Sequence, residues 1–247
     1  RQRQMCIRDS PTSADKTYFL PPTLTNGNVH GIIVLNVYNE RLLRLLAETQ
    51  IPKVFLDTSS LVAPDELNGD LLLMESRTSV RRITSHLLEQ GRTLPGFIGD
   101  ISYAQSNRER YEGFCQALTD AGKKVDSSLC LTTPLGIDTY REEIDTFLSS
   151  LSRMPDAFVC ASDYVACILM QLLEKRGLRV PEDVAVSGFD NNTEDLLAEH
   201  LTTVQVFNEE LGARLALQIL YRIKYPNTPH EVTYLGTNVL YRDSTGD

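Results

Sequence analysis

The sequence predicts an α/β protein built from two parallel, doubly wound sheets with helices on both faces. Short apolar runs of strand length alternate with longer segments of helical period along nearly the whole chain, with glycine or proline between them. Such strand–helix repetition is typical of parallel sheets. The number of repeats indicates two such sheets, and 247 residues are enough for two ordinary domains.

In the first half of the chain, strand and helix patterns follow one another in order. His30–Asn36 contains a continuous Ile/Val/Leu run, which predicts a buried strand. Glu40–Gln50 places its leucines on one helical face, and a helix over Ser79–Gly91 is expected to stop at its glycine. Further strands are predicted at 51–57, 70–74 and 95–100, and a further helix at 107–122.

The second half of the chain continues the same alternation. Asp163–Gly177 predicts a helix with basic residues in its last turn, and 208–223 predicts one with an acidic first turn. Both arrangements match the helix dipole. A further helix is predicted at 138–151, and strands are predicted at 127–132, 156–162, 183–190, 201–206, 231–236 and 238–244.

Composition limits the function classes. The net charge is −9 and the chain has no block of Lys or Arg, so it is a poor candidate for binding DNA by itself. No apolar run approaches the roughly 18–20 residues that cross a bilayer. The five cysteines are odd in number and form no C-x-x-C or Cys/His cluster. We therefore expect reduced thiols in a cytoplasmic protein, without a structural zinc site.

The first ten residues, RQRQMCIRDS, show neither a helical nor a strand period and lack the apolar core of a signal peptide. We interpret residues 1–10 as a non-native cloning, adapter or assembly scar, with a disordered tail as the alternative. They are left out of the predicted fold.

Open parallel sheets bind ligands at the carboxyl ends of their strands. The residues that directly follow the apolar runs are mostly short and polar, which suits a grip on a hydroxylated small molecule. They are Asn36, Asp57, Met74-Glu75, Asp100, Ser162-Asp163 and Asp190-Asn191. The alternative for each is a helix N-cap, for which Asp, Asn and Ser are the preferred residues.

Catalytic motifs are absent from the sequence. It contains no phosphate loop, no G-x-G-x-x-G and no G-x-S-x-G. The four histidines lie in unrelated contexts without an acid or cysteine at motif spacing, while carboxylate pairs brought together by folding are not visible in a sequence. We expect a protein that is not an enzyme, with no catalytic residues, no metal and no cofactor.

Several sequence motifs together are specific to one protein family. The most specific is RVPEDVAVSGFDN over Arg179–Asn191, followed by LTTVQVFNEELGARLALQIL over Leu201–Leu220. With HLLEQG, RYEGFCQAL, PDAFVCASDYVA and YRDS in their order along the chain, these motifs resemble the LacI/GalR family of bacterial transcription regulators. The resemblance covers roughly Lys16 to Thr245, which is nearly all of the chain.

The resemblance implies a two-lobed core of the periplasmic-binding-protein type I fold. The family carries an N-terminal helix-turn-helix, which is not recognisable here, and its first core strand and helix also have no counterpart, so lobe one is expected to be incomplete. Three crossings between the lobes are expected, near Met74-Glu75, Gln205–Phe207 and Gly236-Thr237. Lobe one would comprise about 11–74 with 207–236, and lobe two about 75–206 with 237–247.

The resemblance also implies an effector site. Asp190, Arg110, Asp57 and Ser162 match family positions that face the effector. A carboxylate accepts hydrogen bonds from hydroxyls, and a guanidinium donates up to five. Phe189, Tyr103 or Tyr164 could supply an apolar face for a sugar ring, with core packing as the alternative. Asn36 is a further predicted effector-binding residue, because it follows an apolar strand.

Each effector residue has a structural alternative. Asp190 could cap the turn that follows it, and Arg110 could pair on the helix surface with Glu109 or Glu112. Asp57 could be a turn residue and Ser162 an N-cap.

The implied function is the sensing core of a LacI-type repressor. A small molecule, expected to be a sugar or sugar derivative, would bind between the lobes of a homodimer and control DNA binding through the missing helix-turn-helix. The alternatives are a substrate-binding protein of a sugar transporter and an α/β enzyme acting on sugars. Glu75-Ser76 and Gln205–Phe207 depart from the usual family pattern, so the effector's identity stays open.

Overall fold

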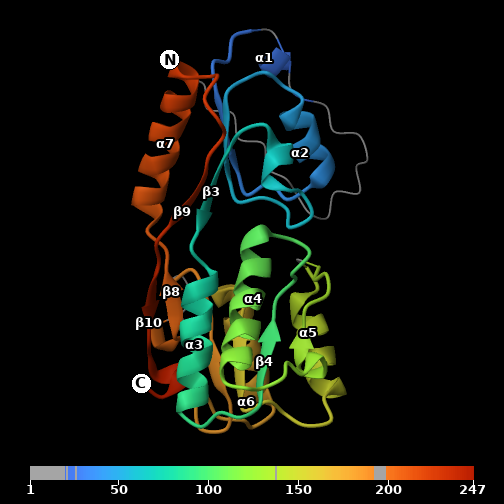
Figure 1. Cartoon of the computed structure of the whole chain (residues 1–247). Coiled ribbons are helices and arrows are strands. Elements are labelled where there is room, and N and C mark those ends of the chain that lie inside the picture. The colour runs from blue at the N-terminus through green and yellow to red at the C-terminus, as the bar shows by residue number, and fades with distance from the viewer. Residues whose placement is uncertain (1–19, 21, 26, 137, 192–198) are drawn as a thin grey trace. The chain divides into compact units, whose positions relative to one another are not determined.

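The computed structural model describes residues 20, 22–25, 27–136, 138–191 and 199–247, so the proposed tail over 1–10 lies outside it. The described residues form two compact units, and the chain passes between them three times (Figure 1). The first unit contains the residues up to Leu73 together with Glu209–Tyr234. The second contains those of Met74–Asn208 together with Leu235–Asp247.

The first unit is built on a four-stranded sheet with the order β1-β2-β3-β9. Its strands are β1 Ile32–Leu35, β2 Lys53–Leu56, β3 Asp70–Met74 and β9 Val232–Leu235. The pairs β1–β2 and β2–β3 are parallel. The helices of this unit are α1 Pro22–Thr25, α2 Glu40–Ala47, the 3-10 turn η1 Pro64–Leu67 and α7 Asn208–Lys224.

The two faces of this sheet are covered by different helices (Figure 1). Val34, Phe55 and Leu71 pack in one apolar cluster with the leucines of α2. Neighbouring residues of a strand point to opposite faces, and Val54 and Asp70, which are partners in the register, face α7 instead. The predicted doubly wound arrangement is therefore confirmed for this sheet.

A buried carboxylate joins α7 to the middle of the first sheet. Asp70 is fully buried, and its two oxygens accept hydrogen bonds from Arg222 Nε (3.0 Å) and Nη2 (2.5 Å), Gln218 Nε2 (2.8 Å) and the N–H of Glu231 (2.9 Å). Burial opposes ionisation, but these hydrogen bonds outweigh it and hold the pKa of the Asp70 carboxyl below its ordinary value.

The second unit is built on a parallel sheet with the order β5-β4-β6-β7. Its strands are β4 Pro95–Ile98, β5 Cys130–Leu131, β6 Ala157–Cys160 and β7 Ala185–Ser187. Its helices are α3 Arg77–Glu89, α4 Gln105–Asp120, α5 Tyr140–Ser150 and α6 Asp163–Lys175. Ile98 and Phe158 face the α5–α6 side in one core cluster, whereas Phe97 packs on Tyr111 and Phe114 of α4.

A two-stranded antiparallel ribbon completes the second unit. It consists of β8 Thr203–Gln205 and β10 Asn238–Leu240. Single parallel bridges, Ser187 to Thr202 and Asp190 to Gln205, attach β8 to the end of β7. The sequence predicted the strands of this ribbon but not their antiparallel pairing.

Most of the predicted strands are a few residues shorter in the structure, and two of them give way to a 3-10 segment. The strand prediction at 127–132 was wrong over its first half, because Asp126 caps a 3-10 turn, η2 Ser127–Leu129, by accepting a hydrogen bond from Ser128 N–H (3.1 Å). The strand predicted at 238–244 ends at Leu240, and the chain then forms a further 3-10 segment, η4 Asp243–Thr245.

Four of the five cysteines lie in the described part of the chain, and none of these four forms a disulfide. Burial raises the pKa of the Cys130 thiol to about 11, which suppresses the reactive thiolate. Cys6 lies outside the described residues. Among the described helices, none combines the length and the apolar character needed to span a membrane.

We expect Arg222→Met to destabilise the first unit by about 3–5 kcal/mol at neutral pH, because it leaves the Asp70 charge buried without its cation. Since the folded pKa of Asp70 is lowered, its stabilising contribution exists above the unfolded value of about 3.9 and is lost as the pH falls through the folded value. In the variant, acid protonates the unpaired carboxyl, so the difference from the wild type should shrink between pH 7 and pH 4. Urea unfolding followed by circular dichroism measures both quantities. Equal stability at pH 7 would contradict the assigned role.

Candidate functional site

The carboxyl ends of the strands carry backbone conformations that non-glycine residues seldom adopt. Asn36 (φ 51°) and Asp57 (φ 58°) follow β1 and β2, and Asp190 (φ 109°) and Asn191 (φ 51°) follow β7. Residues in sparsely populated φ regions cluster at functional sites, where the surrounding structure holds them. Four of the strand-end residues that sequence reasoning selected therefore have this unusual backbone, whereas Asp100, Ser162 and Asp163 do not.

Arg110 and Asp190 lie together at the carboxyl edge of the second sheet. Arg110 projects from α4, and its Nη2 is 3.5 Å from Oδ1 of Asp190. Its guanidinium lies over the ring of Phe189, with 3.6 Å from Cζ to the ring centroid, and its Nη1 donates a hydrogen bond to the carbonyl of Ala161. The structure thus brings together three of the predicted site residues.

The two charges of this pair differ in exposure. The Arg110 side chain is 5% exposed and the Asp190 side chain is 43% exposed. The guanidinium is therefore buried beneath the site, where it stacks on the Phe189 ring and donates a hydrogen bond to the Ala161 carbonyl. The Asp190 carboxylate is the accessible group of the pair. Buried Arg110 Nε has no hydrogen-bond partner in the described part of the chain, so the cation retains donor capacity.

The surface alternative for Arg110 was wrong. Arg110 is buried rather than exposed, and Glu112 forms its ion pair with Arg77 of α3. The alternative for Asp190, a cap on the turn that follows, concerns 192–198, which lie outside the described residues.

Ser162 acts as the N-cap of α6. Its hydroxyl accepts a hydrogen bond from the N–H of Val165 (3.3 Å). The N-cap alternative for Ser162 is therefore confirmed. A direct contact between Ser162 and an effector stays a prediction.

Asp163, next to Ser162, fixes the end of β7 that carries Asp190. Its buried carboxylate accepts a hydrogen bond from Thr203 Oγ1 (2.6 Å), and its N–H donates to the carbonyl of Phe189 (2.8 Å). A Cβ added at Gly188 would collide with the Asp163 carboxylate. This position therefore needs glycine, because β7 passes so close to the start of α6.

The first unit has a polar strand edge of its own. Tyr38 donates hydrogen bonds toward Asp57 Oδ2 (3.2 Å) and Asn36 Oδ1 (3.4 Å), so the two predicted residues share one partner. Asp57 also accepts from the N–H of Thr58 (2.8 Å), as a turn residue does. Sequence reasoning missed Tyr38, although its place two residues beyond a strand end was a usable signal.

Two tyrosines stand at the same end of the second sheet as Asp190. Tyr164, in the first turn of α6, is 59% exposed, and its ring meets that of Tyr140 edge-on with centroids 5.8 Å apart. Burial, followed by the nearby Asp100 carboxylate, raises the pKa of Tyr140. Core packing, the alternative given for Tyr164, is wrong, because most of its side chain is at the surface.

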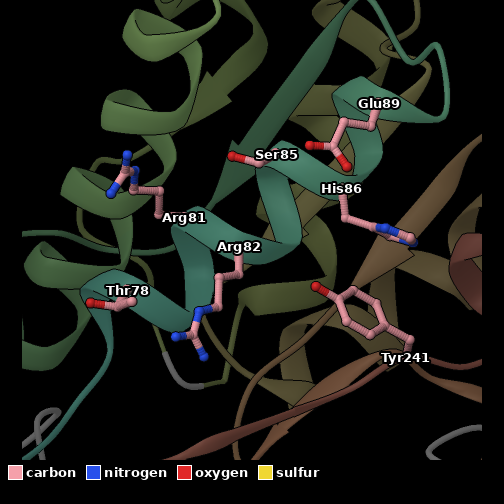
Figure 2. Close-up of a pocket in the computed structure, with 7 residues that line it drawn as sticks. All are labelled: Thr78, Arg81, Arg82, Ser85, His86, Glu89 and Tyr241. Carbon is pink, nitrogen blue, oxygen red and sulfur yellow. The ribbon is translucent and has the colours of Figure 1, made fainter.

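A hollow of about 430 Å³ lies elsewhere on the second unit (Figure 2). It is lined by side chains of α3 and by Tyr241, which follows β10, and it includes none of the predicted site residues. The lining residues are Thr78, Arg81, Arg82, Ser85, His86, Glu89 and Tyr241. In the ranges that the structure describes, no group of three His, Cys, Asp or Glu side chains could hold a metal ion.

The arrangement of two doubly wound sheets joined by three crossings, with polar strand ends, defines a class of ligand-binding cores. The family model of the periplasmic binding protein-like domain matches residues 84–245, which is more than half of the chain. The chain belongs to this family. Its relatives place it among the effector-binding cores of LacI-type regulators.

Three relatives illustrate the similarity. The transcriptional repressor PurR of Aliivibrio fischeri is 28% identical over 244 residues, which is 97% of this chain and 71% of that protein. The transcriptional regulator DegA of Bacillus subtilis is 29% identical over 86% of this chain and 62% of that protein. The solved complex of the transcriptional regulator CelR with cellobiose is 27% identical with a TM-score of 0.80, covering 90% of this chain and 68% of that one.

The chain spans only part of the length of such relatives. It covers 59% of the PurR of Glaesserella parasuis and 62% of DegA. The matched relatives are regulators rather than enzymes.

Gly188→Ala should lower the free energy of unfolding by about 1–3 kcal/mol, because the new methyl group displaces the Asp163 carboxylate from Thr203. Gly212→Ala is the matched control: a Cβ there meets nothing within 4 Å, and α7 should gain up to about 1 kcal/mol. Thermal unfolding of both variants measures the contrast. A Gly188→Ala protein as stable as the wild type would rule out the close approach.

Proposed function

We propose that this chain senses a small hydroxylated molecule, a sugar or sugar derivative, as the core of a LacI-type transcription repressor. The observation that carries the proposal is the pairing of accessible Asp190 with buried Arg110 over the Phe189 ring. Support also comes from the 27% identical regulator CelR, which was solved with cellobiose.

The chemistry of the pair suits a polyhydroxylated ligand. An ionised carboxylate accepts hydrogen bonds from two neighbouring hydroxyls, and the guanidinium donates to ring or hydroxyl oxygens in a fixed geometry. Tyr164, exposed beside Tyr140, offers an aromatic face to the apolar side of a sugar ring. Asn36 and Tyr38 form a second polar edge, with the buried carboxylate of Asp57 behind the Tyr38 hydroxyl.

No catalysis is needed for this function. A ligand shifts a conformational equilibrium only by its difference in affinity for the two states, typically about 1–3 kcal/mol in allosteric proteins. In the proposed whole protein, a homodimer in the cytoplasm, that shift controls DNA binding through a separate helix-turn-helix. The four described cysteines form no disulfide, which favours such a reducing setting over a sugar-binding protein of a transporter.

We expect Asp190→Ala to weaken effector binding by at least about a hundredfold, because charge-assisted hydrogen bonds to the ligand are lost. A thermal-shift screen of sugars, sugar phosphates and nucleobases on the wild-type chain identifies the ligand, and calorimetry measures its affinity for the variant. Asp120→Ala, which removes an exposed carboxylate at the last residue of α4, should bind like the wild type. Unchanged affinity in Asp190→Ala would remove Asp190 from the site.

Tyr164 provides a second test, directed at the apolar face of the ligand. Tyr164→Ala should weaken binding about tenfold, whereas Tyr164→Phe keeps the ring and should bind nearly as well as the wild type. Tyr225→Ala is the matched control, since Tyr225 is also exposed and packed on a neighbouring tyrosine, Tyr221. Equal calorimetric affinities for Tyr164→Ala and the wild type would exclude ring stacking there.

A further inference from the structure

Asn191 links the strand end at Asp190 to the antiparallel ribbon through both ends of its amide. Its Nδ2 donates a hydrogen bond to Gln205 Oε1 (2.6 Å), and its Oδ1 accepts one from Arg242 Nη2 (2.8 Å). Gln205 is the last residue of β8, and Arg242 lies two residues beyond β10. One side chain beside the proposed effector acid therefore contacts the end of β8 and the segment that follows β10.

The direction of this hydrogen-bond chain is fixed by its ends. A guanidinium can only donate and a backbone carbonyl can only accept. Arg242 therefore requires the amide oxygen of Asn191, which leaves Nδ2 for Gln205. The Nε2 of Gln205 in turn donates to the carbonyl of Val206 (2.9 Å), so its Oε1 is the atom that faces Asn191.

The backbone at Asp190 and Asn191 is attached to the same strand. The N–H of Asp190 donates to the carbonyl of Val204 (3.1 Å), and the N–H of Asn191 donates to Thr203 Oγ1 (3.2 Å). Both residues have positive φ, 109° and 51°. Such conformations persist only where neighbouring contacts hold them, and here those contacts come from β8.

The ribbon connects this site to the chain passages between the two units. β8 leads directly into α7 of the first unit, and β10 follows β9 of the first unit. Two of the three passages therefore run through β8, which Asn191 contacts at Gln205, and through β10, which ends two residues before its other partner, Arg242. Gln205 and Asn238 are register partners, so a shift of one arm is transmitted to the other.

We propose that Asn191 is a positioning residue that ties Asp190 to the β8–β10 ribbon, so that an effector held by Asp190 orders the ribbon. The inference rests on the proposed function. Asparagine suits the position for two reasons: it tolerates the left-handed backbone, and it supplies a donor and an acceptor at once. An aspartate there would place an oxygen against Gln205 Oε1.

The test uses Asn191→Gly in the full chain. Glycine adopts the left-handed conformation readily, so the variant removes the amide but not the backbone geometry. Asn68→Gly is the matched control, because Asn68 also has a positive φ (48°) and uses its amide, donating to the Ala47 carbonyl (2.9 Å), away from the ribbon. The probe is cellobiose, followed by ribose and xylulose.

Two quantities are measured with and without the probe at saturation. Calorimetry gives the affinity, and hydrogen exchange gives the protection of the backbone amides of 203–205 and 238–240. We expect Asn191→Gly to bind about tenfold more weakly and to lose the ligand-dependent protection even at saturation. Asn68→Gly should match the wild type in both. Loss of protection at full occupancy is an effect that weaker binding alone does not produce.

The outcomes separate this inference from the proposed function. If no sugar of the panel binds the wild type, the proposed function fails and the inference fails with it. If the wild type binds and Asn191→Gly keeps the ligand-dependent protection, only the positioning role fails. If Asn191→Gly does not fold, Gln205→Leu, which removes the partner on the ribbon and leaves Asn191 in place, decides by the same two measurements.

Discussion

The buried contact between Asp70 and Arg222 fixes a carboxylate at the start of β3 to a guanidinium 152 positions away in the chain. Because Asp70 also accepts from Gln218 and from the backbone N–H of Glu231, all four acceptor positions of the carboxylate are occupied. The first sheet depends on this contact, since α7 and β9 return to it only after the long segment Met74–Asn208 of the second unit. Removing a partner from a carboxylate buried so completely lowers the free energy of unfolding strongly, because the remaining charge is left buried and uncompensated.

In the second unit, two aspartates at neighbouring strand ends have opposite roles because their surroundings differ. Asp163 is buried, and its carboxylate accepts a hydrogen bond from Thr203, which fixes the end of β7 against β8. Because this carboxylate lies so close to the backbone, only glycine fits at position 188. Asp190 keeps 43% of its side chain exposed beside a buried guanidinium. The first residue therefore shapes the strand end, and the second is the group to which the proposed function assigns the ligand. Asn191, which follows Asp190, hydrogen-bonds Gln205 of the ribbon and so attaches this strand end to β8.

The fold could be predicted largely from local patterns, because burial imposes a readable period on the chain. The apolar run over 30–36 and the leucines of α2 are signals of this kind, and both elements exist with ends shifted by a few residues. The exceptions have causes that an apolar pattern does not contain. A capping aspartate, Asp126, converts the first half of one expected strand into a 3-10 turn, and the pairing of β8 with β10 joins segments more than 30 residues apart.

The sequence by itself determined the two parallel sheets and the strand ends at which polar side chains gather, since parallel strands in one sheet must end at the same edge. It also selected Arg110, Phe189 and Asp190, which lie together in the structure. Only the tertiary structure decided how each polar group is used: Ser162 caps a helix, Asp163 holds a strand, and Tyr38 bridges Asn36 and Asp57. These uses depend on which side chains meet across distant segments. Strand order and helix packing decide which side chains meet. The local sequence pattern indicates which residues are buried, but not which residues they contact.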